Sequence, residues 1–111
     1  MTGSSNAPRT PLALSSTESD AVRASVRNGL IDPESARFDP VVAGRTPEGE
    51  VVVCGWVNSK NRMGGYAGKQ PFTGQLVGTE FKLDRIGSDY MQRAFIQDRC
   101  GSLGDFYWGN A

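Results

Sequence analysis

The stretch EVVVCGWVN, residues 50–58, is the strongest strand signal in the chain. Valine and tryptophan favour strands, and apolar side chains stand at both odd and even positions between Val51 and Val57. A strand with one buried face alternates apolar and polar residues, whereas a strand covered on both faces is apolar throughout. Residues 50–58 are therefore expected at the centre of a sheet, with other parts of the chain covering both faces.

Three more strands are expected on either side of this stretch in the sequence. Residues 37–45 precede it, and Pro40 within them favours an edge position or a bulge because proline cannot donate a ladder hydrogen bond. Residues 46–49, TPEG, have the composition of a tight turn. Residues 71–78 and 79–86 come after the central strand as two further strands.

Helix signals stand at both ends of these strands. A hydroxyl residue is followed three positions later by an acid at Ser15 and again at Thr17, a capping pattern. Val22 and Val26 then recur at helical spacing, which predicts a helix over residues 18–28. A single short turn is expected at 32–36, where Asp precedes Pro.

A second helix is expected after Gly87, with Ser88 as its cap and its end near Cys100. The order predicts an α+β domain: an antiparallel β-meander of three to four strands, flanked by an N-terminal and a C-terminal helix that pack on one face of the sheet. Residues 17–111 are expected to form this single domain. Residues 1–16 contain little apolar surface and are expected to be a disordered lead-in or tether.

The composition excludes several classes of protein. The 111 residues contain no histidine, so a Ser-His-Asp triad, a Cys-His pair and a histidine-ligated metal are ruled out. Lys plus Arg and Asp plus Glu number 12 each, and this balance argues against a dedicated nucleic-acid binder. No metal and no cofactor are expected.

The glycine-rich segment 64–70, GGYAGKQ, invites a comparison with phosphate-binding loops. Such a loop has four residues between its glycines and then Lys followed by Ser or Thr at the start of a helix. Here three residues separate Gly64 from Gly68, Gln70 replaces the hydroxyl, and a strand comes next. A turn that uses positive backbone dihedrals explains these glycines better.

The same segment is the best candidate for a binding surface. Residues 51–79 contain three cations and no acid, and loops on a rigid sheet often carry recognition. The candidate binding residues are Asn58, Lys60, Asn61, Arg62, Tyr66 and Lys69. The alternative is structural: Asn58 and Asn61 close the turn by bonding its backbone, and Tyr66 folds onto the sheet.

An enzyme is the minority interpretation. Its candidate residues are Ser59, Lys60 and Tyr66, but Ser59 and Lys60 would point to opposite faces of an extended chain. No pair of carboxylates stands out as acid and base. No catalytic residues are therefore predicted.

The two cysteines, Cys54 and Cys100, allow two interpretations. A bridge between the central strand and the last helix would stabilise the fold by about 4 kcal/mol on the loop-entropy model. The alternative is a pair of reduced, buried cysteines in a cytosolic protein.

Two stretches carry a resemblance to a known group of proteins. LIDPESARF, residues 30–38, resembles the L-x-D-P-x-S-A-x-F opening of small bacterial exported proteins and lipoproteins of uncharacterised function. VCGWVNSKN, residues 53–61, with GGYAG at 64–68 and Phe72, resembles their V-C-G-x-V-N-x-K-N-x-x-G-G-Y-x-G-x-x-x-F core. The resemblance implies an exported protein with a Cys54–Cys100 bridge, and it implies no activity.

The sequence thus favours an exported small binding or structural module, periplasmic or anchored in the outer membrane as a lipoprotein, with an envelope protein or a cell-wall component as partner. Residues 2–6, TGSSN, are typical of the polar segment after a lipidated cysteine, which would be the only membrane contact. The first alternative is an inhibitor or accessory subunit acting through the glycine-rich loop and the aromatic tail 105–109. The others are a small enzyme and a cytoplasmic location.

Overall fold

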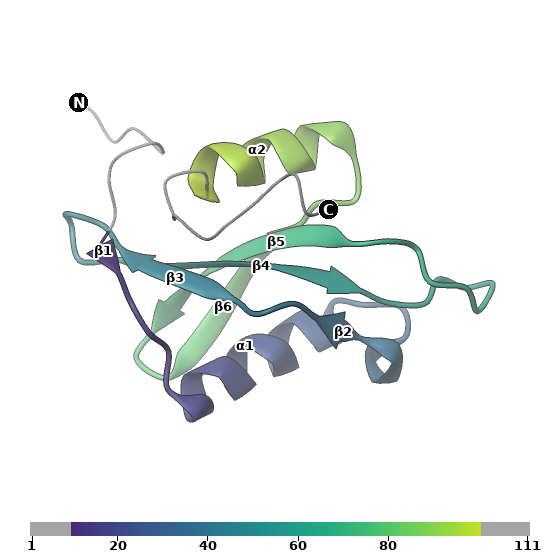
Figure 1. Ribbon diagram of the computed structural model, residues 1–111, viewed down its shortest axis with the longest axis horizontal. Coiled ribbons are helices and arrows are strands. Elements are labelled where there is room, and N and C mark those ends of the chain that lie inside the picture. Colours follow the sequence, from purple (N-terminus) through teal and green to yellow (C-terminus); the bar gives the residue numbers. More distant parts are fainter. Residues whose placement is uncertain (1–9, 101–111) are drawn as a thin grey trace.

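The computed structural model describes residues 10–100 as an antiparallel sheet with one helix on each side (Figure 1). The strands lie in the order β1-β3-β4-β5-β6, and β2 also pairs with β4. The elements are β1 (Thr10–Pro11), α1 (Ser16–Asn28), the 3-10 turn η1 (Pro33–Ser35), β2 (Arg37–Phe38), β3 (Val42–Arg45), β4 (Val51–Asn58), β5 (Gln70–Val77), β6 (Glu80–Ile86) and α2 (Tyr90–Cys100). The predicted α+β class and the predicted meander, here β3 to β6, are confirmed.

Strand β4 lies in the middle of the sheet and is buried on both faces, as its sequence predicts. Because side chains alternate along a strand, Val53 and Val57 face α1, whereas Val52, Cys54 and Trp56 face α2. Two separate apolar clusters result, and β4 contributes to both.

The α1-face cluster is the larger of the two. Its buried members are Val22, Val26, Ala43, Val53, Val57, Phe72, Leu76 and Phe81. Gly55 lets the Phe72 ring lie close against β4, because a Cβ at Gly55 would come within 2.6 Å of the ring. Phe38 meets the same ring edge-on, with the centroids 6.1 Å apart. This face is therefore held by aliphatic and aromatic packing.

The α2-face cluster is smaller and contains a covalent link. Its buried members are Val52, Cys54, Trp56, Ile96 and Cys100. Cys54 and Cys100 form a disulfide with their Cα atoms 6.2 Å apart, so the bridge implied by the resemblance is present.

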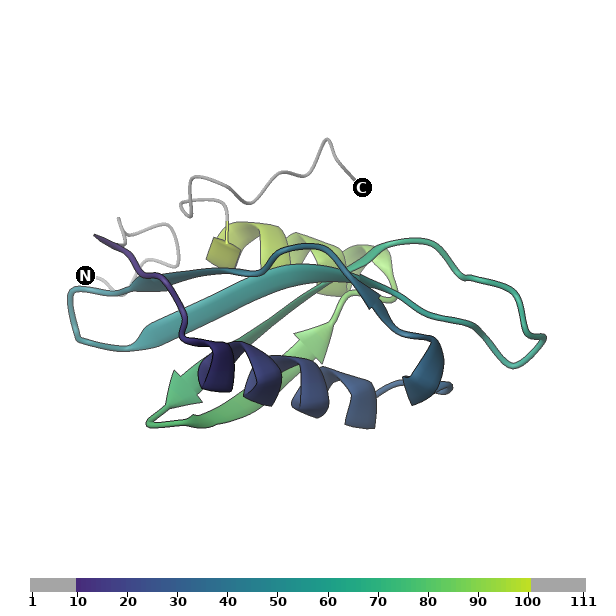
Figure 2. The ribbon, with the colours of Figure 1, turned by 60° about the horizontal axis from the view of Figure 1, so that its bottom comes forward.

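The two helices cover opposite faces of the sheet (Figures 1 and 2). The expectation that both pack on one face is therefore wrong. The physical reason lies in β4, whose two apolar faces each need a covering layer.

Helix α1 begins as its capping pattern predicts. The Ser15 hydroxyl accepts from the Glu18 amide at 3.1 Å, and the Glu18 carboxylate accepts from the Ser15 amide at 2.9 Å. The second pattern, at Thr17, lies inside the helix. For α2 the prediction of Ser88 as cap is wrong, since the Asp89 carboxylate accepts from the Gln92 amide at 2.9 Å.

The predicted strand 37–45 is split into β2 and β3, and both halves pair with β4. Pro40 lies in the break, where its missing N–H disturbs no ladder. The turn at 46–49 forms as predicted, with the Gly49 amide donating to the Thr46 carbonyl at 2.9 Å. The turn predicted at 32–36 is also present as η1.

The folded domain begins earlier than the sequence predicts. Thr10–Pro11 pairs with β3, and Leu12 and Leu14 pack against the α1-face cluster, although composition predicts a disordered lead-in over residues 1–16. Two leucines spaced by one residue are enough to cover the rim of a cluster that is already formed. The structure does not describe residues 1–9 and 101–111. The predicted tether at the N-terminus and the aromatic tail 105–109 fall in these ranges, so those predictions lie outside the described residues.

Candidate functional site

The loop between β4 and β5 is an extended hairpin that projects from one end of the sheet (Figure 2). Lys60 and Tyr66 form an antiparallel bridge beyond the two strands, and the Ala67 amide donates to the Ser59 carbonyl at 3.0 Å. The hairpin therefore continues the pairing of β4 and β5 and ends in a tight turn at residues 61–65.

Two of the candidate binding residues hold the backbone of this hairpin. The Asn58 Oδ1 accepts from the Gly68 amide at 3.0 Å. The Asn61 Oδ1 accepts from the Met63 amide at 2.9 Å and from the Gly65 amide at 3.3 Å. Their carbonyl oxygens act as the structural alternative expects, and each side chain keeps an NH2 group that can donate.

Tyr66 and Lys60 attach the hairpin to η1 and β2. The Tyr66 hydroxyl donates to the Ser35 carbonyl at 3.0 Å, and the Lys60 amide donates to the Ser35 hydroxyl at 2.8 Å. The Arg37 guanidinium lies over the Tyr66 ring, 4.3 Å from its centroid, and the Lys60 ammonium lies 5.8 Å from it. These contacts give the hairpin a fixed orientation on the domain.

The three cations of the loop are in different surroundings. Lys69 forms an ion pair with Asp39, with 2.9 Å between Nζ and Oδ2. Lys60 lies beside Tyr66, whereas Arg62 is exposed at the tip next to Met63, whose side chain is 92% exposed. The tip therefore presents one cation and one flexible apolar side chain to the solvent.

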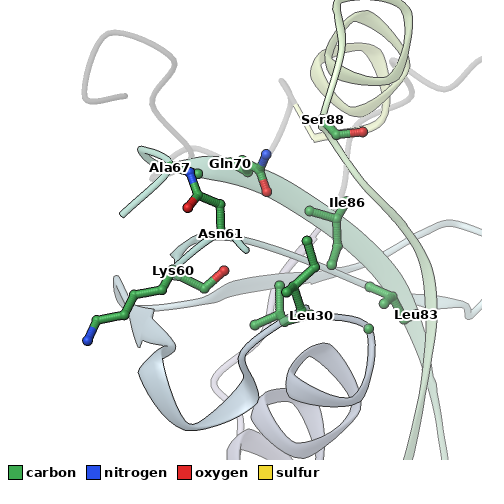
Figure 3. A pocket seen from close by; sticks show the side chains of 11 residues that line it. Leu30, Lys60, Asn61, Ala67, Gln70, Leu83, Ile86 and Ser88 are labelled. Atoms are coloured by element: carbon green, nitrogen blue, oxygen red, sulfur yellow. The ribbon is translucent and has the colours of Figure 1, made fainter. Parts of the chain in front are cut away.

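A cavity of about 530 Å³ lies at the base of the hairpin (Figure 3). Its walls come from the end of α1, from both arms of the hairpin, from β6 and from the segment before α2. The lining residues are Gly29, Leu30, Ile31, Ser59, Lys60, Asn61, Ala67, Gln70, Leu83, Ile86 and Ser88. Of the candidate binding residues, only Lys60 and Asn61 line this cavity.

The sequence missed most of this cavity. Gly29–Ile31, Leu83 and Ile86 carry no motif of a binding site, and they meet only in the folded chain. Ile31, which follows α1, keeps its apolar side chain 64% exposed beside this cavity, and only the folded chain reveals that exposure.

The three candidate catalytic residues are not arranged as a reacting group. Ser59 lines the cavity, whereas the Tyr66 hydroxyl is engaged with the Ser35 carbonyl. The Lys60 side chain extends away from the cavity floor (Figure 3). Within residues 10–100, no three His, Cys, Asp or Glu side chains gather as a metal site requires.

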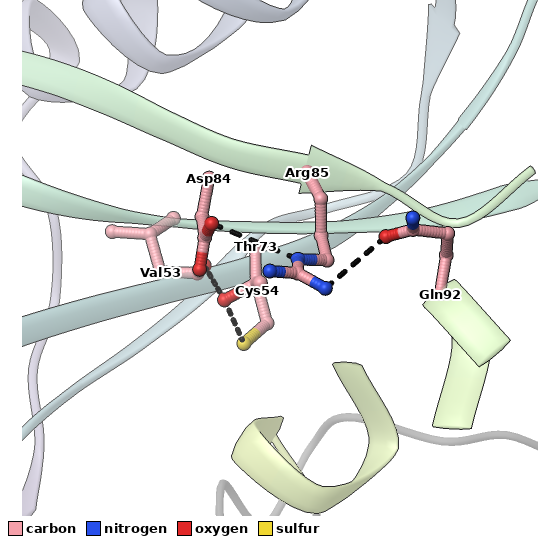
Figure 4. A network of polar contacts seen from close by, with 6 residues as sticks. All are labelled: Val53, Cys54, Thr73, Asp84, Arg85 and Gln92. Carbon is pink, nitrogen blue, oxygen red and sulfur yellow. Dashed lines mark hydrogen bonds and ion pairs between the residues drawn. The ribbon is translucent and has the colours of Figure 1, made fainter. Parts of the chain in front are cut away.

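A second polar group lies under α2 beside the disulfide (Figure 4). Thr73 is fully buried, donates to the Val53 carbonyl at 3.1 Å, and has its hydroxyl 3.4 Å from the Cys54 sulfur. Arg85 lies nearby between Asp84 and Gln92. Because Thr73 is inaccessible, its contacts satisfy a buried hydroxyl and offer nothing to a ligand.

No family model, curated protein or solved structure matches this chain. In the described part of the chain, no helix has the length and apolar character to cross a membrane.

Proposed function

We propose that the chain is a non-catalytic module of an exported bacterial protein, periplasmic or lipid-anchored, which binds an envelope protein or a cell-wall component. The observation that carries this proposal is the disulfide between Cys54 and Cys100, which uses both cysteines of the chain. Disulfides persist in oxidising compartments such as the periplasm and are rare in the cytosol. The motifs at 30–38 and 53–72 support the same compartment.

The hairpin 58–70 supports a role in recognition. Its backbone is fixed by the Asn58 and Asn61 side chains and by the anchoring of Tyr66. A loop held in one conformation loses little entropy when it binds. The side chains left for a partner are those at the tip, Arg62 and Met63, and methionine adapts to irregular surfaces.

The absence of catalysis is supported by the contacts of Tyr66, one of the three candidate residues. Its hydroxyl donates to the Ser35 carbonyl and attaches the hairpin to η1, so its proton is already engaged with the backbone.

An inhibitor or accessory subunit is the second candidate. The projecting form of the hairpin favours it, because a protruding, rigid tip can enter a cleft of another protein (Figure 2). Its other expected element, the aromatic tail 105–109, lies outside the described residues.

The compartment is tested by alkylating intact cells that express the chain behind its natural upstream sequence. We expect intact mass to show no alkylated cysteine in the unreduced protein and two after reduction. Two freely alkylated thiols in the folded, unreduced protein would contradict export.

The recognition surface is tested with purified peptidoglycan sacculi and with photo-crosslinking in envelope extract. We expect Arg62→Ala with Met63→Ala to abolish capture while leaving unfolding free energy within about 0.5 kcal/mol of the parent, as surface changes do. The matched control is Arg45→Ala with Val77→Ala, at the other end of the sheet. If the tip variant captures as much sacculi or partner protein as the control variant and the parent do, the tip is not the binding site.

A further inference from the structure

The cavity behind the hairpin is the feature that the proposed partner contact leaves unused. Its volume of about 530 Å³ falls among the pockets that proteins use for small molecules, roughly 300–1,000 Å³. It lies at the base of the hairpin, whereas the proposed contact with a partner is at the tip. An inference about the cavity therefore goes beyond the proposed function and does not depend on it.

The apolar part of the cavity is aliphatic throughout. Leu30, Leu83 and Ile86 form its floor (Figure 3), and the exposed residues Ile31 and Ala67 add further apolar surface to the lining. The lining residues, all within the described range 10–100, include no aromatic side chain. Nucleobases are commonly held by stacking on aromatic rings. The walls therefore suit an aliphatic chain better than a nucleobase.

Each polar side chain that lines the cavity can donate a hydrogen bond, and Ser59, Gln70 and Ser88 can also accept one. Asn61 uses its Oδ1 for two backbone amides, so the group that it can offer to a ligand is its NH2. Gln70, Ser59 and Ser88 add groups that can donate. Lys60 is the single charged residue of the lining, which contains no carboxylate. This combination is complementary to an anionic head group at the mouth.

We propose that this cavity binds a soluble, single-chain anionic amphiphile such as a medium-chain fatty acid. The chain lies against Leu30, Leu83 and Ile86, and the head group lies at the rim beside the Asn61 NH2. The Lys60 side chain extends outward there, and its ammonium supplies the positive charge that attracts an anion. A membrane lipid is the less favoured source of the same chemistry. Met63, between Arg62 and Gly64, is the single apolar residue at the hairpin tip, which is too little apolar surface to enter a bilayer.

The test is titration of the full chain with decanoate, followed by calorimetry and by amide chemical shifts. Decyltrimethylammonium, with the same chain and the opposite charge, is the matched ligand. We expect saturable decanoate binding, shifts confined to the lining segments, and affinity at least about tenfold weaker for the cation. Equal affinity for the two ligands, or no saturable binding of decanoate, would overturn the proposal.

Two variants locate the site on the protein. Lys60→Met keeps the aliphatic stem beside Tyr66 and should weaken decanoate binding about fivefold, whereas Lys82→Met, on the opposite face of β6, should leave it unchanged. Ala67→Phe should occlude the cavity and reduce affinity by more than about tenfold. An unchanged melting temperature for each variant verifies the fold.

Further outcomes separate the alternatives. Decanoate binding that survives Ala67→Phe would contradict the assigned cavity. Binding to phosphatidylglycerol vesicles without binding to dissolved decanoate would overturn the soluble ligand in favour of a membrane. Capture of sacculi that is lost in the tip variants but kept in Ala67→Phe would leave the proposed function standing even where the cavity proposal fails.

Discussion

The two faces of the sheet are stabilised in different ways. On the α1 face, Val22 and Val26 pack against Phe72 and Phe81, and no covalent link joins helix and sheet among the described residues. On the α2 face, Ile96 is the single buried apolar side chain that the helix adds besides Cys100. Tyr90 and Met91, at the start of the same helix, are 81% and 74% exposed.

This contrast indicates what the disulfide does. Burial of apolar surface contributes about 25 cal/mol for each Å², so a helix that buries few side chains gains little from packing alone. The bridge at the end of α2 compensates by restricting the unfolded chain. One helix is therefore docked by its own amphipathic face, and the other is held in place by a covalent bond to β4.

The largest effect is expected from removing the bridge. The bridge joins residues separated by 46 positions in the sequence. The double variant Cys54→Ala with Cys100→Ala removes this link, which should lower the free energy of unfolding by about 4 kcal/mol. Urea denaturation measures the loss, and hydrogen exchange should show α2 amides exchanging before α1 amides. Reduction of the parent protein is the control and should match. A loss below about 1 kcal/mol would show that packing alone docks α2.

The coupling energy between a core residue and the bridge is a smaller quantity, and it should differ between the two faces of the sheet. Ile96→Ala should cost about 2–5 kcal/mol in the bridged protein, and a different amount in the protein without the bridge, because Ile96 shares the α2-face cluster with both cysteines. Val26→Ala lies on the other face and should cost the same in both backgrounds within about 0.5 kcal/mol. The measurement is a double-mutant cycle by urea denaturation. Equal coupling for the two residues would erase the distinction between the faces.

Features that depend on neighbouring residues could be predicted from the sequence. The apolar run of β4, the capping residues before α1 and the turn at 46–49 each result from local chemistry, and each is present. Pro40 predicts a bulge or an edge, but its effect of dividing one strand into two could not be read from the sequence.

Features that depend on distant segments could not be predicted. The side of the sheet that each helix covers is decided by the competition for the two faces of β4, and the packing of Leu12 and Leu14 requires a formed α1-face cluster. The same reason hid the cavity, since Leu30 and Ile86 are neighbours only after β6 has paired with β5. Composition is enough to find the polar residues of the hairpin. It does not show that Asn58 and Asn61 support the backbone whereas Arg62 is exposed at the tip, because those roles depend on contacts in the folded chain.

The N-terminal segment tests how far the α1 face extends. Leu14 is half-buried against the α1-face cluster, so Leu14→Ala should cost about 1 kcal/mol and lower the melting temperature by roughly 4–8 °C. Ala13→Ser, at an exposed neighbour, is the control and should change the melting temperature little. Unchanged stability in Leu14→Ala would show that Leu14 does not help to hold the fold, as the composition of residues 1–16 predicts.

An effect of similar size is expected at the N-cap of α1. Ser15→Ala removes the hydroxyl that accepts from the Glu18 amide and should cost about 1 kcal/mol, the usual contribution of a helix N-cap. Thr17→Ala is the matched control, because Thr17 begins the rival capping pattern but lies exposed inside the helix, where the change should stay within about 0.5 kcal/mol. Thermal unfolding of the two variants measures the difference. Equal losses would mean that the capping box adds nothing to the docking of α1, which would then depend on the packing of the α1-face cluster.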